Sequence, residues 1–147
     1  MKNYQHILFA VDYSEHCDYV ACKAKEFSEQ YRSKLSMIHV LDNIPMPDTQ
    51  YGSVIHLDKA YDNEFLEEEK NRFISLADQL GIARDCRWLI WGSPKREIPP
   101  LAEREKVDLI IVGSHGRHGI SLLLGSTADS VLHHAKCDVM AVRLKDD

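Results

Sequence analysis

Short, unbroken hydrophobic runs divide this chain and predict buried β-strands. Four runs, at 7–11, 35–40, 109–112 and 139–142, are dominated by apolar residues, many of them β-branched, and a fifth, weaker run occupies 87–91. Runs of this length are typical of strands that are covered on both faces, as in a parallel sheet. The pattern therefore predicts five buried strands.

Helical periodicity fills most of the intervening segments. Apolar residues recur three and four positions apart over 15–31, 62–80 and 126–134, which predicts amphipathic helices. Ser14 is a suitable N-cap for the first helix, and Gly81 follows the second helix where a left-handed residue ends many helices. The strands and helices thus alternate along the chain.

Residues 93–105 carry conflicting helix signals. Ser93 followed by Pro94 is a favourable helix start, because a proline at the first helical position loses no hydrogen bond. Pro99 and Pro100 follow within the same segment, where each interior proline costs about 3 kcal/mol. We therefore expect a helix that begins late, near Pro99, or one with a strained first turn.

The alternation predicts an α/β fold with a five-stranded parallel sheet, helices on both of its faces and right-handed crossovers. The segment 41–57 contains two prolines and a glycine, lacks a clear period, and is expected to be one long loop. Long loops in compact domains are often functional. The length of 147 residues and the lack of repeats or linkers suggest a single domain, 1–147.

Charge and hydropathy exclude several classes of partner. The net charge is −5 and no block of lysine or arginine is present, which argues against nucleic acid. No apolar run reaches the length of a membrane span, so no membrane partner is expected. The N-terminus lacks the features of a signal peptide, so we expect a cytoplasmic protein.

A glycine-rich segment carries the strongest chemical signal. Residues 113–119 contain three glycines directly after the fourth predicted strand, and Gly125, Ser126 and Thr127 begin the final predicted helix. Glycines allow backbone N–H groups to approach an anion closely, and a helix N-terminus supplies free N–H donors. The alternative is a flexible glycine loop with Ser126 as an ordinary N-cap. The two elements together favour a phosphate site.

Acidic residues follow the first two predicted strands. Asp12 comes directly after the first strand and Asp42 lies just past the second. Ligands of open α/β sheets bind outside the carboxyl ends of the strands, where an acid can accept hydrogen bonds from ribose or an adenine amine. Asp12 can alternatively cap the first helix, and Asp42 is better explained as a solvated loop residue. Neither a P-loop nor the G-x-G-x-x-G fingerprint is present.

The histidines do not form a standard metal site. The residues that could be imagined as a zinc set are His115, His118, His133, His134 and Cys137. Their spacing does not provide the paired ligands of structural zinc, so no metal site is predicted. His115 and His118 are better interpreted as phosphate neighbours, and His39, inside the second strand, as a buried core histidine.

Several segments together resemble the universal stress protein family over roughly residues 4–144. The resemblance is carried by segments 7–14, 37–40, 92–94, 107–117, 124–128 and 135–139. It implies the adenine-nucleotide alpha-hydrolase-like, Rossmann-like fold, with strand order 3-2-1-4-5. It also implies ATP or AMP as ligand, with or without Mg, and a homodimer. In that order the last strand is an edge, so Val139–Leu144 is expected to pair across the dimer.

Carried over by position, the resemblance assigns a nucleotide site. Adenine and ribose would meet Ala10, Val11, Asp12 and Val40. Phosphates would be held by Gly113, Gly116, Gly125, Ser126 and Thr127. His115 and Arg117 are added as candidate phosphate contacts. One departure is that eight residues separate Gly116 from Gly125, one fewer than in the usual motif of nucleotide-binding members.

Three functions remain open at this point. The first is a stress-response regulatory module that binds an adenine nucleotide and acts on an unknown protein partner. The second is a slow ATPase, nucleotide hydrolase or transferase. No catalytic residues are predicted, because Asp12 is the only well-placed carboxylate and two-metal chemistry lacks ligands. The third is a nucleotide-independent interaction module using the dimer surface and loop 41–57, which leaves the glycines unexplained.

Overall fold

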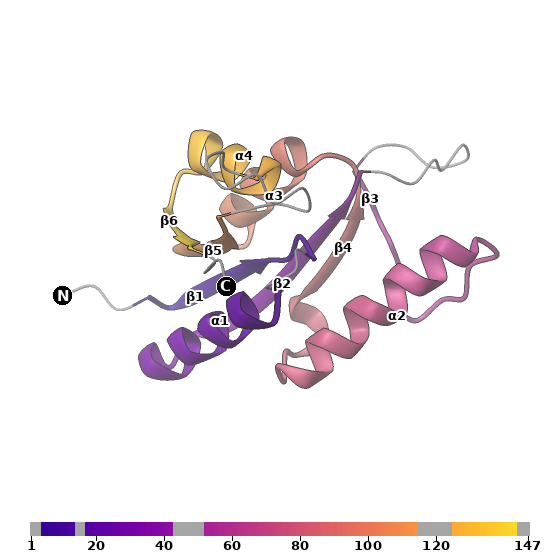
Figure 1. Ribbon diagram of the computed structural model, residues 1–147, viewed down its shortest axis with the longest axis horizontal. Helices are drawn as coiled ribbons and strands as arrows, with labels where there is room; N and C mark the ends of the chain where they lie inside the picture. The colour runs from indigo at the N-terminus through magenta and orange to yellow at the C-terminus, as the bar shows by residue number, and fades with distance from the viewer. Residues whose placement is uncertain (1–3, 14–16, 43–51, 115–124, 144–147) are drawn as a thin grey trace.

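The chain folds into one mixed sheet with helices on both faces (Figure 1). The computed structural model describes residues 4–13, 17–42, 52–114 and 125–143. Its elements, in chain order, are β1 (His6–Ala10), α1 (Cys17–Tyr31), β2 (Lys34–Leu41), β3 (Ser53–Val54), α2 (Glu64–Gln79), η1 (Arg84–Cys86), β4 (Arg87–Trp91), α3 (Pro94–Arg104), β5 (Leu109–Gly113), α4 (Ser126–His134) and β6 (Asp138–Val142). The predicted strands and helices are all present, with boundaries that differ by a few residues.

The sheet has six strands in the order β3-β4-β2-β1-β5-β6. The five predicted strands are parallel to one another and keep the expected 3-2-1-4-5 order. The expectation of one long loop over 41–57 is wrong in part, because β3 pairs antiparallel with the outer edge of β4. Gly52 and Ile55 donate to carbonyls of β4, each at 2.7 Å. A two-residue strand depends on these long-range bonds and leaves no periodicity to detect.

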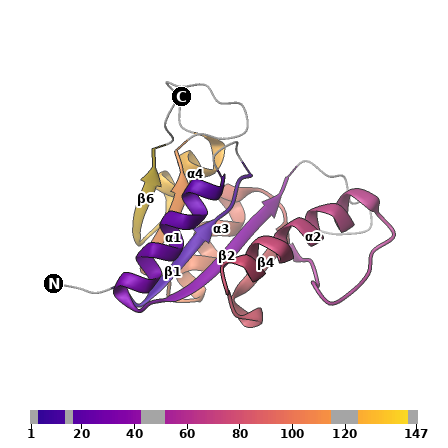
Figure 2. The ribbon, with the colours of Figure 1, turned by 60° about the horizontal axis from the view of Figure 1, so that its bottom comes forward.

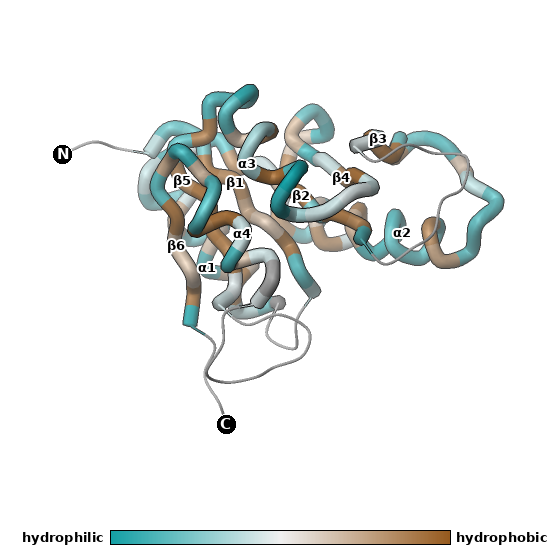
Figure 3. The backbone as a smooth tube through the Cα atoms, turned by 90° about the horizontal axis from the view of Figure 1, so that it is seen from above, coloured by the Kyte–Doolittle hydropathy of each residue, from teal (hydrophilic) through white to brown (hydrophobic). Residues whose placement is uncertain are grey.

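Each face of the sheet is covered by a different pair of helices (Figure 1, Figure 2). One core, which includes Phe9 and Met37, joins the sheet to α1 and α2. The other, which includes Leu8 and Ile38, joins it to α3 and α4. Adjacent strand residues point to opposite faces, so a strand buried on both faces is apolar at most of its positions. Figure 3 shows these hydrophobic strands at the centre of the molecule.

Helix α3 begins earlier than expected. It starts at Pro94 and continues through Pro99 and Pro100, so the expected late start is wrong. These prolines remove only the bonds to carbonyls of the first turn, in an exposed part of the helix. The helix is retained by its apolar side, where Ile98 and Leu101 are each only 2% exposed. Tertiary burial here outweighs the local cost.

The ends of α2 agree with their sequence signals. Asn63 caps the helix by accepting from the N–H of Leu66 at 3.2 Å, and Gly81 has a φ of +68°. The proposed cap of α1, Ser14, lies outside the described residues. Among the helices that the structure describes, none has the length and apolar character required to cross a membrane.

Candidate functional site

The sheet reverses its winding direction between β1 and β5. The chain proceeds from β1 through β2 to β4 on one side, and then returns to place β5 and β6 on the other side of β1. Ile7, Leu8 and Phe9 pair with Leu109, Ile110 and Ile111 across this junction. Helices leave the carboxyl ends of β1 and β5 toward opposite faces, which opens a crevice where ligands of such sheets bind. This confirms the expected position of the switch point.

The two ends of the glycine-rich segment meet at this switch point. Ser114 follows β5 and donates its N–H to Val142 of β6 at 2.9 Å, while its carbonyl accepts from Gly125 at 2.9 Å. Gly125 is the N-cap of α4, and its carbonyl accepts the helical bond from Asp129. The N–H groups of the first helical turn have no acceptor inside the helix. They lie at the edge where the switch point opens, as an anion site requires.

The residues assigned to the nucleoside lie at the ends of β1 and β2. Ala10, Val11 and Val40 are all at least 95% buried, and Asp12 is half-buried. Val11 continues the pairing of β1, since it donates to Ile38 at 2.9 Å. Tyr13 then turns the chain with a φ of +53°. The structure therefore brings these predicted residues together at the carboxyl ends of β1 and β2. Asp42 is exposed at the same end, as expected of a solvated residue.

Ser114 is a polar residue that the resemblance did not assign to the nucleotide site. It is 9% exposed, and its buried hydroxyl oxygen has no hydrogen-bond partner among the described residues. A buried hydroxyl usually has a partner. The sequence did contain a signal for Ser114, because this small polar residue directly follows an apolar strand and lies within the glycine motif.

Three assigned residues, His115, Gly116 and Arg117, lie outside the described residues. The backbone of Ser126 begins α4, and Thr127 is 8% exposed in its first turn. Gly113 ends β5 and pairs with Val142. The described part of the candidate phosphate site therefore consists of Gly113, Ser114, Gly125 and the start of α4.

A half-buried carboxylate, that of Glu97, lies at the same carboxyl end of the sheet. Gly92 follows β4 and donates to Leu41 of β2 at 2.9 Å, and Glu97 of α3 covers it. A Cβ on Gly92 would lie 2.7 Å from Glu97 Oε2 and 2.9 Å from its Cγ. Burial raises the pKa of the Glu97 carboxyl above its usual value. The glycine of the Gly92-Ser93-Pro94 segment is therefore explained by contact with this side chain.

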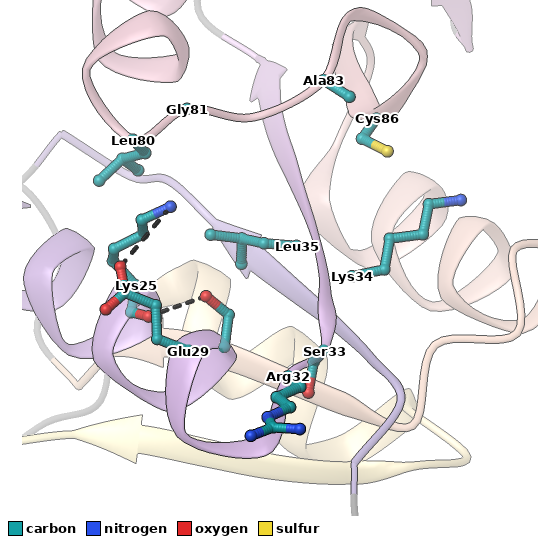
Figure 4. A pocket seen from close by; sticks show the side chains of 11 residues that line it. Lys25, Glu29, Arg32, Ser33, Lys34, Leu35, Leu80, Gly81, Ala83 and Cys86 are labelled. Carbon is teal, nitrogen blue, oxygen red and sulfur yellow. Dashed lines mark hydrogen bonds and ion pairs between the residues drawn. The ribbon is translucent and has the colours of Figure 1, made fainter.

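A shallow groove of about 570 Å³ lies at the opposite end of the strands, among α1, the end of α2 and the start of β2 (Figure 4). Its cationic side chains do not converge: Lys25 pairs with Glu29 at 3.8 Å, and Arg32 and Lys34 point away from its centre. The groove is also at the amino ends of the strands, where open α/β sheets do not bind ligands. It is therefore not the candidate site.

Comparisons with known proteins agree on one family. The model of the universal stress protein family matches residues 3–143. The chain is 44% identical over 146 residues to universal stress protein A homolog 2 of Coxiella burnetii, covering 99% of both chains. It is 32% identical to universal stress protein A homolog 1 of the same organism, over 98% of this chain and 99% of that protein.

Solved structures share the fold at lower sequence identity. The hypothetical protein MJ0577 aligns with a TM-score of 0.76 at 24% identity, covering 99% of this chain and all of that chain. A universal stress protein in complex with cAMP aligns with a TM-score of 0.68 at 19% identity, over 97% of this chain and 98% of that one. At these identities the likeness concerns the fold.

Proposed function

This chain belongs to the universal stress protein family of stress-response proteins, and we propose that it is a cytoplasmic regulatory module that binds ATP or AMP. The observation that carries the proposal is the arrangement at the end of β5. There the N-terminus of α4 is fixed beside Ser114 by the bond from Gly125 to its carbonyl. The partial positive charge of a helix N-terminus favours a phosphate at that point.

Phosphate recognition uses mainly the backbone. The first-turn N–H groups of α4 face the ligand, and Gly116 and Gly125 permit close approach. The Ser114 hydroxyl, buried and without a partner in the described chain, fits a site whose missing partner is a ligand oxygen. Arg117 and His115 supply positive charge from the same segment. Mg, if bound, would neutralise phosphate charge next to these groups.

The nucleoside lies toward β1 and β2 in this proposal. Asp12 accepts from ribose hydroxyls or the adenine amine, and Val40 packs against the base. The structural relative solved with cAMP supports an adenine nucleotide as the ligand class. Because no Glu or Gln occurs between Gly113 and Asp129, this segment offers no side chain of the type that orients an attacking water in many GTPases. Binding without rapid hydrolysis is therefore the proposed activity.

The proposed assembly is a homodimer through β6. This strand forms one edge of the sheet, and Val139, Met140 and Ala141 are half-buried along it. An apolar strand edge favours pairing with another strand, and a second copy pairs it antiparallel about a two-fold axis.

The first experiment identifies the ligand that the protein carries. The protein is purified natively and denatured, and released nucleotides are identified by mass spectrometry. Calorimetry with ATP and AMP, each with and without Mg, then measures affinity on the emptied protein. We expect saturable binding of at least one adenine nucleotide, and hydrolysis of labelled ATP far below the median enzyme turnover of about 10 per second. Lack of binding to every adenine nucleotide would remove the proposal.

A further inference from the structure

A buried histidine of β2 contacts the segment that carries Asp12. His39 is 3% exposed, and its ring nitrogen Nδ1 lies 2.7 Å from the carbonyl oxygen of Val11. A carbonyl only accepts hydrogen bonds, so Nδ1 carries a hydrogen and donates it. The N–H of Val11 meanwhile donates to Ile38 at 2.9 Å. Both main-chain groups of the residue before Asp12 are therefore held by β2.

Helix α2 lies against both His39 and the segment that carries Asp12. Glu69 Oε2 lies 3.7 Å from His39 Nε2, on the side of the ring opposite Val11. One turn later, the guanidinium of Arg72 lies 3.9 Å from the ring centroid of Tyr13. The Tyr13 and His39 rings meet edge to face with centroids 4.6 Å apart. Residues three apart lie on one face of a helix, so a single face of α2 restrains the residues on both sides of Asp12.

This arrangement restrains a backbone that is otherwise unfavourable. Tyr13 has a φ of +53°, a left-handed conformation that a non-glycine residue adopts only at a cost. The aromatic and cation–π contacts with His39 and Arg72 oppose its relaxation. Asp12 lies between this fixed turn and the fixed carbonyl of Val11. Its backbone position is thus set from the α1–α2 face of the sheet.

We propose that His39 is a positioning residue for nucleotide binding, which holds Val11 and thereby Asp12, and that Glu69 of α2, 3.7 Å from the other ring nitrogen, supports it. The inference rests on the proposed function, because Asp12 is the residue assigned there to the nucleoside. It gives His39 a role in ligand binding in addition to the packing role that the sequence predicted for it. It also makes α2 part of the nucleotide site, although this helix lies on the face opposite α4.

The chain contains a matched control for this role. His6, in β1, is also buried and also donates from Nδ1 to a backbone carbonyl, that of Glu105, at 3.0 Å. It lies at the opposite end of the sheet from Asp12. Loss of either histidine removes the same kind of buried bond, although His6 lies on the α3–α4 face of the sheet and His39 on the α1–α2 face. Only the loss of His39 is expected to alter ligand affinity.

The test compares ATP affinity and folding stability in four variants. His39→Leu keeps bulk but cannot donate, so we expect affinity to fall at least about tenfold. His39→Asn places an amide donor near Nδ1 and should recover most of that loss. His6→Leu should bind as wild type, even if it loses stability. Glu69 has a half-buried side chain, so Glu69→Ala should fold readily, and we expect it to weaken ATP binding by about threefold. This variant still tests the proposal if His39→Leu does not fold.

Two results would overturn the positioning role: wild-type affinity in folded His39→Leu and Glu69→Ala, or an equal loss in His6→Leu. Backbone amide spectra of the ligand-free variants give an independent readout. His39→Leu should displace the signals of Asp12 and Tyr13, whereas His6→Leu should leave them in place. If the wild type binds no adenine nucleotide, the proposed function fails. These spectra then decide the positioning role alone, and unchanged Asp12 and Tyr13 signals in His39→Leu would remove it.

Discussion

The N–H of Gly125 donates to the carbonyl of Ser114 at 2.9 Å, so the two residues that flank segment 115–124 are bonded to each other. This bond joins the end of β5 to the N-cap of α4. It fixes both ends of the segment regardless of its length. A segment one residue shorter than the usual family spacing is compatible with this closure, because the ends are held by the fold.

Gly125→Val is expected to weaken ATP binding at least about tenfold while the protein remains folded. Gly125 has φ −63° and ψ 158°, a conformation open to any residue, so the effect comes from the added side chain beside the phosphate. Ala83→Val is the control, since Ala83 has nearly the same dihedrals, φ −61° and ψ 150°, at the opposite edge of the sheet. Calorimetry with equal affinities for both variants and the wild type would contradict the phosphate site.

Ser114→Ala should leave the ligand-free protein as stable as the wild type or stabilise it slightly. Its hydroxyl has no partner among the described residues, so removing it breaks no known bond. Ser36→Ala should instead cost about 1–3 kcal/mol, because it removes a bond of 2.6 Å to His6 Nε2. Urea denaturation compares the two. ATP affinity should fall only in Ser114→Ala, and a large loss of stability there would show that the hydroxyl has a structural partner.

Stability is expected to decrease as the pH falls below about 6.5, the usual pKa of histidine. Burial lowers the pKa of His6 in the folded protein, so the unfolded chain takes up a proton that the folded protein does not. The stabilisation is fully present above pH 6.5 and is lost as the pH falls toward the lower folded pKa. Urea denaturation at a series of pH values measures this slope. A His6→Asn variant should be less stable at neutral pH and should show a smaller slope; an unchanged slope would exclude His6 as its source.

Gly92→Ala should destabilise the protein by about 1 kcal/mol. The new Cβ would lie 2.7 Å from Glu97 Oε2 and 2.9 Å from Cγ, so the Glu97 side chain must move. Glu97→Ala removes the obstacle, and the Gly92→Ala cost should largely disappear in that background. The double-mutant cycle is measured by thermal and urea unfolding. Additive effects would mean that the glycine is required for another reason.

Ala141→Pro should convert the proposed dimer into a folded monomer. The Val142 carbonyl accepts from Ser114, the residue after β5, and successive strand residues direct their main-chain groups to alternate sides. Ala141 therefore presents its N–H on the side of β6 that faces away from β5, where a proline removes that N–H without breaking the β5–β6 ladder. Val142→Pro instead removes an N–H that points toward β5, so it should reduce stability. Sedimentation of the wild type as a monomer at micromolar concentration would contradict the dimer.

The sequence by itself determined the strands, most helices and the chemistry of the candidate site. The five long strands could be predicted because a strand covered on both faces is apolar at nearly every position, as at Ile7–Val11. The edge strand β6 is only half-buried over most of its length. The candidate phosphate site could be proposed because its glycines and the helix start lie close together in the chain, at 113–127. These are local patterns, and each follows from one segment and its immediate environment.

Only the tertiary structure decided features that depend on distant contacts. The strand β3 exists through its bonds to β4, and α3 persists through Pro99 and Pro100 because Ile98 and Leu101 are buried against the sheet. The role inferred for His39 likewise requires Val11 from β1 and Glu69 from α2 to meet on either side of one ring. A single sequence does not specify which carbonyl or carboxylate faces a buried imidazole, because folding alone brings residues that are 28 and 30 positions apart into contact.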